Sequence, residues 1–428
     1  MKGWPASPGR AVPAQALPRA PALGRVKVLH VITRFWAGAG ANTLLSAIGM
    51  DSDTYEVWIA GMPGGDLWQR ARAAGVRTVE IPRLREVLTP ADLIVLWRLV
   101  RLIREQRFTI VHTHSAKGGF LGRLAAWLCR TPVVVHTFHG LSFHDHMSKP
   151  RYLAYRCLER ATRRCTHAFI AVAPRLAREV VEQRLAPPGG VTVVPSAVDL
   201  DGIPDGFDPA ARAELGVPSV VPLVGTVGRI DHQKAPLDFV RMAAALRAAH
   251  PDAAFVIVGD GPLAGEVRRL ATELGVRIRI TGYRSDAARL VSGLDVFVTT
   301  SLYEGLGRAL TEALAAARPV VASAVNGVPD LVEHGATGLL AAPTDPKGVA
   351  RAVAWLLDHP ELAATMGRQG SARVRAGFAP SAMCAATDGC YRRLLGLPDL
   401  RAVDGLSPFV TPEAVQQSLA SGGQRPGR

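Results

Sequence analysis

The chain has 428 residues, too long for one ordinary domain of about 150 residues, so we expect two or three domains. Apolar residues make up 48% and charged residues 20%, a balance typical of globular proteins, and no apolar run reaches the roughly 18 residues that a membrane span needs. The net charge of +14 lies in the first part of the chain, because residues 1–198 carry 27 Lys and Arg against 12 Asp and Glu, whereas residues 199–428 carry 23 against 24. This excess suggests that the first half of the chain meets an anionic partner, and a bias toward arginine from GC-rich coding is the alternative explanation.

The ends and the cysteines point to a cytoplasmic globular protein. Residues 1–24 contain five prolines and no acidic residue, and residues 399–428 are rich in Gly, Ser and Gln, so we expect a disordered leader and a disordered tail there. The five cysteines form no CxxC pair and have no histidine spacing suited to zinc, which indicates a reducing compartment and no disulfide framework.

Short apolar runs alternate with helical patterns between residues 25 and 198. The first run, 26–33, precedes a loop with Gly38 and Gly40 and a helical pattern over 41–48; two more helical patterns cover 67–74 and 88–107. Further strands are predicted over 55–60, 109–112, 133–136, 168–172 and 191–194. Strands of four to eight residues alternating with helices predict a doubly wound parallel sheet.

The same alternation repeats between residues 219 and 398. Strands are predicted over 220–227, 254–258, 276–280, 296–299, 319–322 and 338–340, with helices that include 237–249 and 307–317. The Gly- and Pro-rich segment 199–218 between the halves predicts a hinge. We therefore expect an α/β protein of two facing Rossmann-like domains, 25–198 and 219–398, with a ligand cleft between them. The last helices of the second domain could pack against the first domain.

A basic loop follows the first strand of the second half. Glycines, among them Gly228, allow close approach of a ligand to the backbone, and Arg229 and Lys234 lie on the way to a helix. Arginine binds phosphate oxygens bidentately and lysine acts as a point charge, so this loop suits a diphosphate. An ordinary strand-to-helix turn with solvated bases is the alternative.

A second loop carries two carboxylates. Glu304 precedes the glycine-rich turn Gly305-Leu306-Gly307, and Glu312 falls in the first turns of the next helix. Carboxylates accept hydrogen bonds from paired hydroxyls such as those of sugars and ribose, and free amides at a helix N-terminus bind anions. A solvated helix residue is the alternative for Glu312.

The two motifs together, GRIDHQK over 228–234 and EGLGRALTE over 304–312, resemble family 4 retaining glycosyltransferases of the GT-B fold. The resemblance covers residues 26–395 and includes VHTHS at 111–115, VHTFHGLSF at 135–143, VGDGPL at 258–263 and TGYR at 281–284. Three features depart from the family pattern: PSAVD at 195–199 stands where many relatives have Asn-Gly before the Val/Ile-Asp, Ala235 stands where glycine is usual, and Arg308 stands where a smaller or apolar residue is common.

The resemblance implies a role for each matching residue. Arg229 and Lys234 would neutralise the donor pyrophosphate, Glu304 would hold the donor sugar, and Glu312 would accept from the ribose. His139 would contact the donor sugar. The remaining substrate-binding positions implied by the resemblance are Gly40, His114, Gly228, Gly282, Tyr283, Arg284, Gly305, Leu306 and Gly307.

Other functions receive less support from the sequence. A sugar-nucleotide epimerase would share the architecture but needs acid and base groups that the first half does not obviously supply. An NAD-dependent oxidoreductase would need a third glycine where Thr43 stands. A metal site among His112, His114, His136 and His139, with His144, Asp145 and His146 nearby, is conceivable, as is one at the triplets Asp51–Asp53 or Asp199–Asp201, but we expect no metal.

We expect a metal-independent, retaining transferase without a cofactor, which moves a sugar from a nucleotide-sugar, a UDP-sugar by preference, to a glycan or a polyprenyl-diphosphate-linked acceptor. No nucleic acid is expected as a partner. Two basic helical faces suggest peripheral attachment at the inner face of a membrane: Arg156, Arg160 and Arg163 in 149–165, and Arg98, Arg101 and Arg104 near Trp97. Solvated arginines on packed helices are the alternative.

Overall fold

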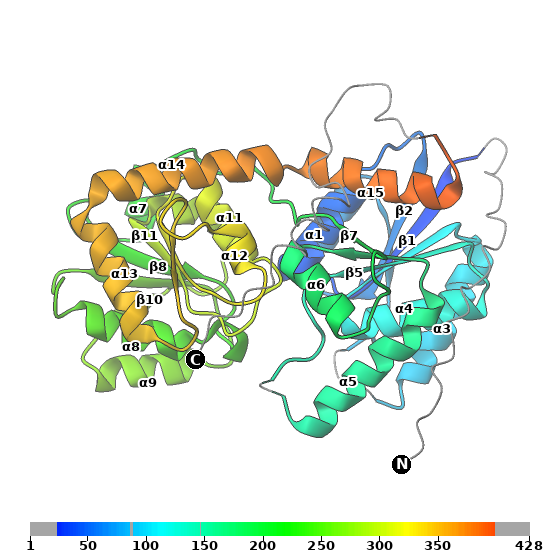
Figure 1. Ribbon diagram of the computed structural model, residues 1–428, viewed down its shortest axis with the longest axis horizontal. Helices are drawn as coiled ribbons and strands as arrows, with labels where there is room; N and C mark the ends of the chain where they lie inside the picture. Colours follow the sequence, from blue (N-terminus) through cyan, green and yellow to red (C-terminus); the bar gives the residue numbers. More distant parts are fainter. Residues whose placement is uncertain (1–23, 86–88, 146, 399–428) are drawn as a thin grey trace, which may run out of the picture.

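Two parallel β-sheets, each flanked by helices, form two lobes that face each other (Figure 1). The computed structural model describes residues 24–85, 89–145 and 147–398. The tail predicted for 399–428, and residues 1–23 of the predicted leader, lie outside these described residues. The five cysteines are unpaired, and none of the described helices is long and apolar enough to cross a bilayer.

The first lobe is built on seven strands in the order β3-β2-β1-β4-β5-β6-β7. The strands are β1 (Val26–Arg34), β2 (Tyr55–Met62), β3 (Arg77–Glu80), β4 (Ile110–His114), β5 (Val133–Phe138), β6 (Ala168–Ala171) and β7 (Val191–Val193). Their helices are α1 (Ala37–Ile48), α2 (Leu67–Ala73), α3 (Asp92–Gln106), α4 (Ala116–Leu128), α5 (Lys149–Thr162) and α6 (Pro174–Glu182). Central strands such as β4 and β5 are buried along their whole length, as expected for a parallel sheet covered on both faces.

The second lobe has six strands in the order β10-β9-β8-β11-β12-β13. These are β8 (Leu223–Val227), β9 (Ala254–Val258), β10 (Ile278–Ile280), β11 (Val296–Thr299), β12 (Val320–Ser323) and β13 (Leu339–Ala341). Its helices are α7 (Pro209–Glu214), α8 (Pro236–Leu246), α9 (Ala264–Glu273), α10 (Ala287–Leu290), α11 (Arg308–Ala315), α12 (Val328–Leu331), α13 (Pro346–Asp358) and α14 (Pro360–Gly377).

The last helix, α15 (Pro380–Leu395), lies on the first lobe. Helix α14 runs along the second lobe, and α15 continues from it onto α1 and the first sheet (Figure 1). Tyr391 is fully buried there, and Tyr55 donates a hydrogen bond of 2.7 Å to Asp388. The chain therefore connects the lobes twice.

The segment 199–218, predicted as a hinge, contains helix α7. Asp208 caps this helix by accepting from the amide of Ala210 at 2.8 Å, and the buried Arg212 donates to the carbonyl of Gly293 at 2.8 Å and to Asp295 at 2.9 Å. These contacts make α7 an integral element of the second lobe. Strand β3 was also missed from sequence, because its ends, Arg77 and Glu80, are exposed and charged at the edge of the sheet.

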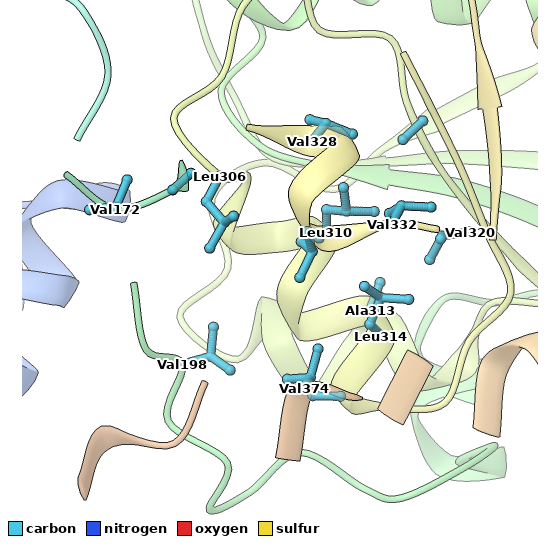
Figure 2. Close-up of a cluster of buried hydrophobic side chains, with 14 of the residues drawn as sticks. Val172, Val198, Leu306, Leu310, Ala313, Leu314, Val320, Val328, Val332 and Val374 are labelled. Carbon is cyan, nitrogen blue, oxygen red and sulfur yellow. The ribbon is translucent and has the colours of Figure 1, made fainter. Parts of the chain in front are cut away.

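Apolar packing continues across the interface between the lobes. One buried cluster joins first-lobe residues such as Phe138 and Val172 to second-lobe residues such as Leu306 and Leu310. Figure 2 shows Val172 beside Leu306, with Leu310, Ala313 and Leu314 of α11 extending the cluster into the second lobe. The burial fixes the two lobes against each other at the loop that precedes α11.

The two predicted basic faces differ in exposure. Arg160 on α5 donates to the carbonyl of Gln183 at 3.1 and 3.0 Å, and Arg156 and Arg163 are also half-buried, so the predicted stripe on α5 is not a free surface. On α3, by contrast, the residues Leu93, Trp97, Arg98, Arg101 and Arg104 are all exposed. We call these five residues the α3 face.

Candidate active site

The predicted site residues gather where the carboxyl ends of the two sheets face each other. A cavity of about 460 Å³ lies between the β5–α5 loop and α6 of the first lobe and the loops after β8 and β11 of the second. It is lined by His139, Gly140, Glu304 and Gly305, together with residues that include Gln233, Tyr303 and Asn326. A larger cavity of about 620 Å³ around Asp295 and Arg318 lies at the opposite, amino-terminal edge of the second sheet, where ligands of parallel sheets do not normally bind.

The lobes meet most closely at His139 and Gly305. A methyl group built on Gly305 would lie 1.8 Å from the carbonyl oxygen of His139, and one built on Gly327 would lie 1.9 Å from the carbonyl oxygen of Gly305. Only glycine fits between these backbones. The predicted sugar-contacting histidine and the predicted anion-binding turn are thus brought together from sequence positions 166 residues apart.

The basic loop after β8 presents Arg229 and Lys234 at this edge. Gly228 has a φ of +153°, and the carbonyl of Gly228 packs so closely on Gly259 that a Cβ there would lie 1.9 Å away. Arg229 binds Asp231 at 2.9 Å and its side chain is 46% exposed. Ala235, which replaces the usual glycine, adopts a φ of +44° directly before α8, so the left-handed turn is kept at a cost in backbone strain.

Glu304 is bound from three sides. Its carboxylate contacts the ammonium of Lys234 and accepts a hydrogen bond from the hydroxyl of Ser301 at 2.9 Å, and its amide donates to the side-chain oxygen of Asn326 at 3.1 Å. The side chain is only 8% exposed. The fold therefore brings Lys234 into contact with Glu304, seventy positions later in the sequence, and these contacts fix the carboxylate of Glu304 at the cavity wall.

Glu312 is also buried, on α11, and it is not among the described residues that line the cavity. Arg308 donates to it from Nε at 2.8 Å, and burial raises the pKa of the Glu312 carboxyl. Gly307, with a φ of +96°, precedes the helix, and Leu306 packs in the interlobe cluster. Arg308, the unusual residue of this turn, thus neutralises the buried carboxylate.

The loop Gly282–Arg284 lies at the edge of the cleft. Gly282 has a φ of +78° and pairs with Gly259, while the 71% exposed Tyr283 donates from its hydroxyl to Asp66 of the first lobe at 3.3 Å. The side chain of Arg284 binds Glu214 at 2.8 Å and Asp286 at 2.7 Å. Only the backbone of Arg284 is therefore placed to frame a ligand.

Gly38 and Gly40, predicted to lie in a loop, belong to the first turn of α1 (Ala37–Ile48) and have different surroundings. A Cβ on Gly40 would lie 2.9 Å from the backbone of Phe35, so Gly40 serves the packing of α1 on its own lobe. A Cβ on Gly38 would instead meet the Cβ of Arg308 at 3.8 Å, across the cleft. Of this pair, the structure brings Gly38 rather than the predicted Gly40 to the second lobe.

A row of histidines lies under the cavity. The Nε2 atom of His139 is 3.0 Å from Nδ1 of His114, whose Nε2 is 2.9 Å from Nδ1 of His30. Burial lowers the pKa of His139 to about 4 and that of His30 to about 3. His30 is not among the residues predicted to form the site. The available signal in the sequence was a histidine inside the apolar run that forms β1, and in the structure this histidine is in register with His112.

The conceivable metal sites are occupied by internal contacts. His30, His112 and His114 offer nitrogens within 4.8 Å of one another, but His112 already bonds Tyr391 at 2.5 Å and Thr137 at 2.7 Å. Asp51 accepts from the amide of Asp53 at 3.1 Å and from Thr54. Asp199 of the other triplet lies 3.4 Å from Arg70. His146 lies outside the described residues.

Comparison with known proteins identifies the family. Residues 37–197 match the family model described as glycosyl transferase 4-like domain, and residues 207–373 match the model described as glycosyl transferases group 1. The chain is 33% identical over 273 residues to the UDP-Gal:alpha-D-GlcNAc-diphosphoundecaprenol alpha-1,3-galactosyltransferase of Escherichia coli, covering 62% of this chain and 70% of that one. It is 32% identical to the D-inositol 3-phosphate glycosyltransferase 2 of Catenulispora acidiphila, covering 69% and 73%.

Solved structures show the same fold. Anabaena HepE in complex with UDP and glucose superposes with a TM-score of 0.73 at 19% identity, covering 86% of this chain and 99% of that one. WaaG, a glycosyltransferase of lipopolysaccharide biosynthesis, gives 0.69 at 16% identity, covering 85% and 99%. The predicted GT-B fold is confirmed, and these relatives give no support to the epimerase alternative. With both lobes matched and the two motifs joined at one cleft, the chain belongs to the family 4 glycosyltransferases.

Proposed function

We propose that the protein transfers a sugar from a UDP-sugar to a hydroxyl of a polyprenyl-diphosphate-linked glycan, with retention of configuration and without a metal ion. The observation that carries this proposal is the contact between Lys234 and Glu304, because Glu304 lines the cavity that His139 lines from the other lobe. The contact brings a cation and a carboxylate to the cavity wall, beside Gly305 before α11, and Arg229 lies on the same loop as Lys234. The similarity to the E. coli enzyme, whose name specifies a UDP-sugar and a GlcNAc-diphosphoundecaprenol acceptor, supports the choice of substrates.

The charges of the site suit departure of a diphosphate. Arg229 and Lys234 would bind the donor's phosphate oxygens, and Lys234, which has three N–H donors, can serve Glu304 and a phosphate together. As the bond between the anomeric carbon and the phosphate oxygen breaks, these cations stabilise the charge that develops on the leaving UDP. The acceptor hydroxyl would attack the same face of the sugar, and its proton would pass to the departing phosphate oxygen.

Glu304 and Glu312 divide the recognition of the donor. Glu304, held at the cavity wall by Ser301 and Lys234, would accept from hydroxyls of the transferred sugar. Glu312, farther along α11, would accept from the ribose. Within the described cavity lining, Glu304 is the carboxylate that the second lobe contributes, and Asp145 and Glu179 line the cavity from the first lobe.

The test is acceptor-dependent release of UDP. Purified protein is incubated with a panel of UDP-sugars, with and without undecaprenyl-diphosphate-GlcNAc, in buffer containing EDTA. We expect release from at least one UDP-sugar only when the acceptor is present, and we expect it to persist in EDTA. Turnover of UDP-sugars to isomers without acceptor would instead identify an epimerase, and abolition by EDTA with rescue by Mn²⁺ would contradict metal independence.

We also propose that the α3 face attaches the protein to the anionic inner face of the membrane, near its lipid-linked acceptor. Leu93 and Trp97 are 73% and 58% exposed, and the guanidinium of Arg101 lies 5.7 Å from the ring centre of Trp97. Aromatic and aliphatic side chains among arginines are typical of surfaces that bind lipid headgroups. Each arginine near such a surface contributes about 1 kcal/mol, so the three arginines of the α3 face allow reversible attachment.

Vesicle co-sedimentation tests this attachment. Wild type should bind vesicles containing anionic lipid but not neutral ones, and binding should fall with salt, because charge attraction is screened over about 8 Å at physiological ionic strength. The variant Arg98→Glu/Arg104→Glu should lose binding, whereas the control Arg268→Glu/Arg269→Glu on exposed α9 of the second lobe should retain it. Equal binding by both variants would contradict a role for the α3 face.

A further inference from the structure

Three histidines form a hydrogen-bonded row that begins at the cavity and ends inside the first sheet. Nε2 of His139 lies 3.0 Å from Nδ1 of His114, and Nε2 of His114 lies 2.9 Å from Nδ1 of His30. The rings of His30 and His114 are stacked with centres 5.2 Å apart. His139 lines the cavity, while His30 and His114 are buried.

Each of these imidazoles is neutral at physiological pH, because burial lowers the pKa of all three well below the ordinary value. A neutral imidazole carries one N–H and one bare nitrogen. Each contact in the row must therefore have one donor and one acceptor, so the three rings point their protons in the same direction. Two arrangements satisfy this condition, and they leave opposite ends of the row protonated.

The inner end of the row distinguishes the two arrangements. Nε2 of His30 is buried and has no hydrogen-bond partner among the described residues. If the protons pointed inward, His30 would bury an N–H without an acceptor, and such orphaned donors are rarer in proteins than bare acceptors. With the protons pointing outward, Nδ1 of His30 donates to His114, Nδ1 of His114 donates to His139, and the remaining proton of His139 is on its own Nδ1.

We propose that His30 is a positioning residue that acts through His114 to keep the proton of His139 on Nδ1. His139 then offers a hydrogen-bond donor, not an acceptor, to the donor sugar. This inference rests on the proposed function for the identity of the ligand, but the state of the ring does not depend on it. A hydroxyl oxygen of the sugar would accept from Nδ1, which fixes the orientation of the sugar as the bond to UDP breaks.

The tautomer can be read directly by NMR. Protein labelled with ¹⁵N-histidine is measured without substrate, and the His139 signals are assigned as those missing from His139→Gln. We expect a protonated Nδ1 and an unprotonated Nε2 in wild type, and a changed or mixed tautomer in His30→Phe, which keeps a ring but no nitrogen. A wild-type His139 protonated on Nε2 would overturn the proposal, as would an unchanged His139 in His30→Phe.

Kinetics separate positioning from a merely structural role. His30→Asn places an amide nitrogen near the position of Nδ1 and should keep both the His139 tautomer and kcat, whereas His30→Phe should lower kcat about tenfold, the effect of one hydrogen bond, with unchanged UDP affinity. Equal losses in both variants with an unaltered tautomer would contradict the inference. Because the NMR experiment needs no substrate, failure of the proposed function would leave its result intact.

Discussion

At the scale of single residues, the two cations of the site should behave differently when removed. Arg229 is half exposed and paired with Asp231, whereas Lys234 neutralises Glu304, whose side chain is 8% exposed. Because both side chains would stabilise the charge that develops on the leaving diphosphate, loss of either Arg229 or Lys234 should lower kcat by about 10² to 10³. Only Lys234→Ala should also lower the thermal midpoint, because it leaves a buried carboxylate unpaired.

Steady-state kinetics and thermal unfolding of Arg229→Ala and Lys234→Ala check this prediction. Arg241→Ala, which removes an exposed arginine paired with Asp238 on α8, is the matched control and should change neither property. Near-normal turnover in both site variants would refute the phosphate-binding role. The contact between Lys234 and Glu304 thus gives Lys234 a second role, in folding stability, beside its role in phosphate binding.

The two glutamates should separate nucleotide binding from sugar transfer. Glu312→Gln keeps the side-chain volume but weakens acceptance from the ribose, so UDP affinity should fall about tenfold, in line with a charged hydrogen bond of roughly 1.5–3 kcal/mol. Glu304→Gln should leave UDP affinity unchanged and lower the rate of transfer. Calorimetry with UDP, alongside transfer assays, measures both, and the reverse pattern would exchange the proposed roles.

At the scale of elements, five histidines lie within or directly after strands of the first sheet, and burial lowers the pKa of each; they are His30, His112, His114, His136 and His139. The unfolded chain, with ordinary histidines near 6.5, binds more protons below that pH than the folded chain. The stability that these neutral rings contribute is therefore complete above pH 6.5 and lost as the pH falls toward their folded values.

Each such ring contributes up to about 1.4 kcal/mol per pH unit in this window. The free energy of unfolding, measured in denaturant at pH 7.5 and 5.5, should thus decrease less in His136→Gln than in wild type, by about 1 kcal/mol. Identical pH dependence in the two proteins would contradict neutral burial of His136.

Sequence patterns predict elements better than they predict the surroundings of each face. Strands 254–258 and 296–299 were predicted with the bounds of β9 and β11, because apolar runs bounded by polar residues fix both ends of a buried strand. The stripe on α5 was wrong as a free surface, because the guanidinium of Arg160 is bound by the carbonyl of Gln183, which only the folded chain brings near. The charged residues of the site could be predicted from the sequence. The contact between Lys234 and Glu304, seventy residues apart, and the row of histidines that ends at His30 could not be predicted, because only the folded chain brings these side chains together.

At the scale of the whole molecule, catalysis depends on the contact between the lobes. The methyl group of Gly305→Ala would lie 1.8 Å from the carbonyl oxygen of His139, so the backbones of the two lobes must move apart at this contact. We expect Gly305→Ala to lower kcat and to increase the radius of gyration in solution scattering. Gly265→Ala, where the added methyl group meets nothing within 4 Å, should do neither.

A normal rate and an unchanged radius for Gly305→Ala would show that this close approach is not needed for transfer. Gly305 does not have a positive φ, so alanine can adopt its backbone conformation without strain. The expected loss of kcat therefore arises from the clash with the carbonyl oxygen of His139. The same contact explains why residues from both lobes line one cavity.

The most direct test of the account is the anomeric configuration of the product. The UDP-sugar that gives acceptor-dependent turnover is converted with undecaprenyl-diphosphate-GlcNAc in EDTA, and the coupling of the anomeric proton at the new glycosidic bond is measured by NMR. We predict the same anomeric configuration as in the UDP-sugar. An inverted product, or transfer that occurs only with added metal, would contradict the proposed retaining, metal-independent transfer between the two lobes.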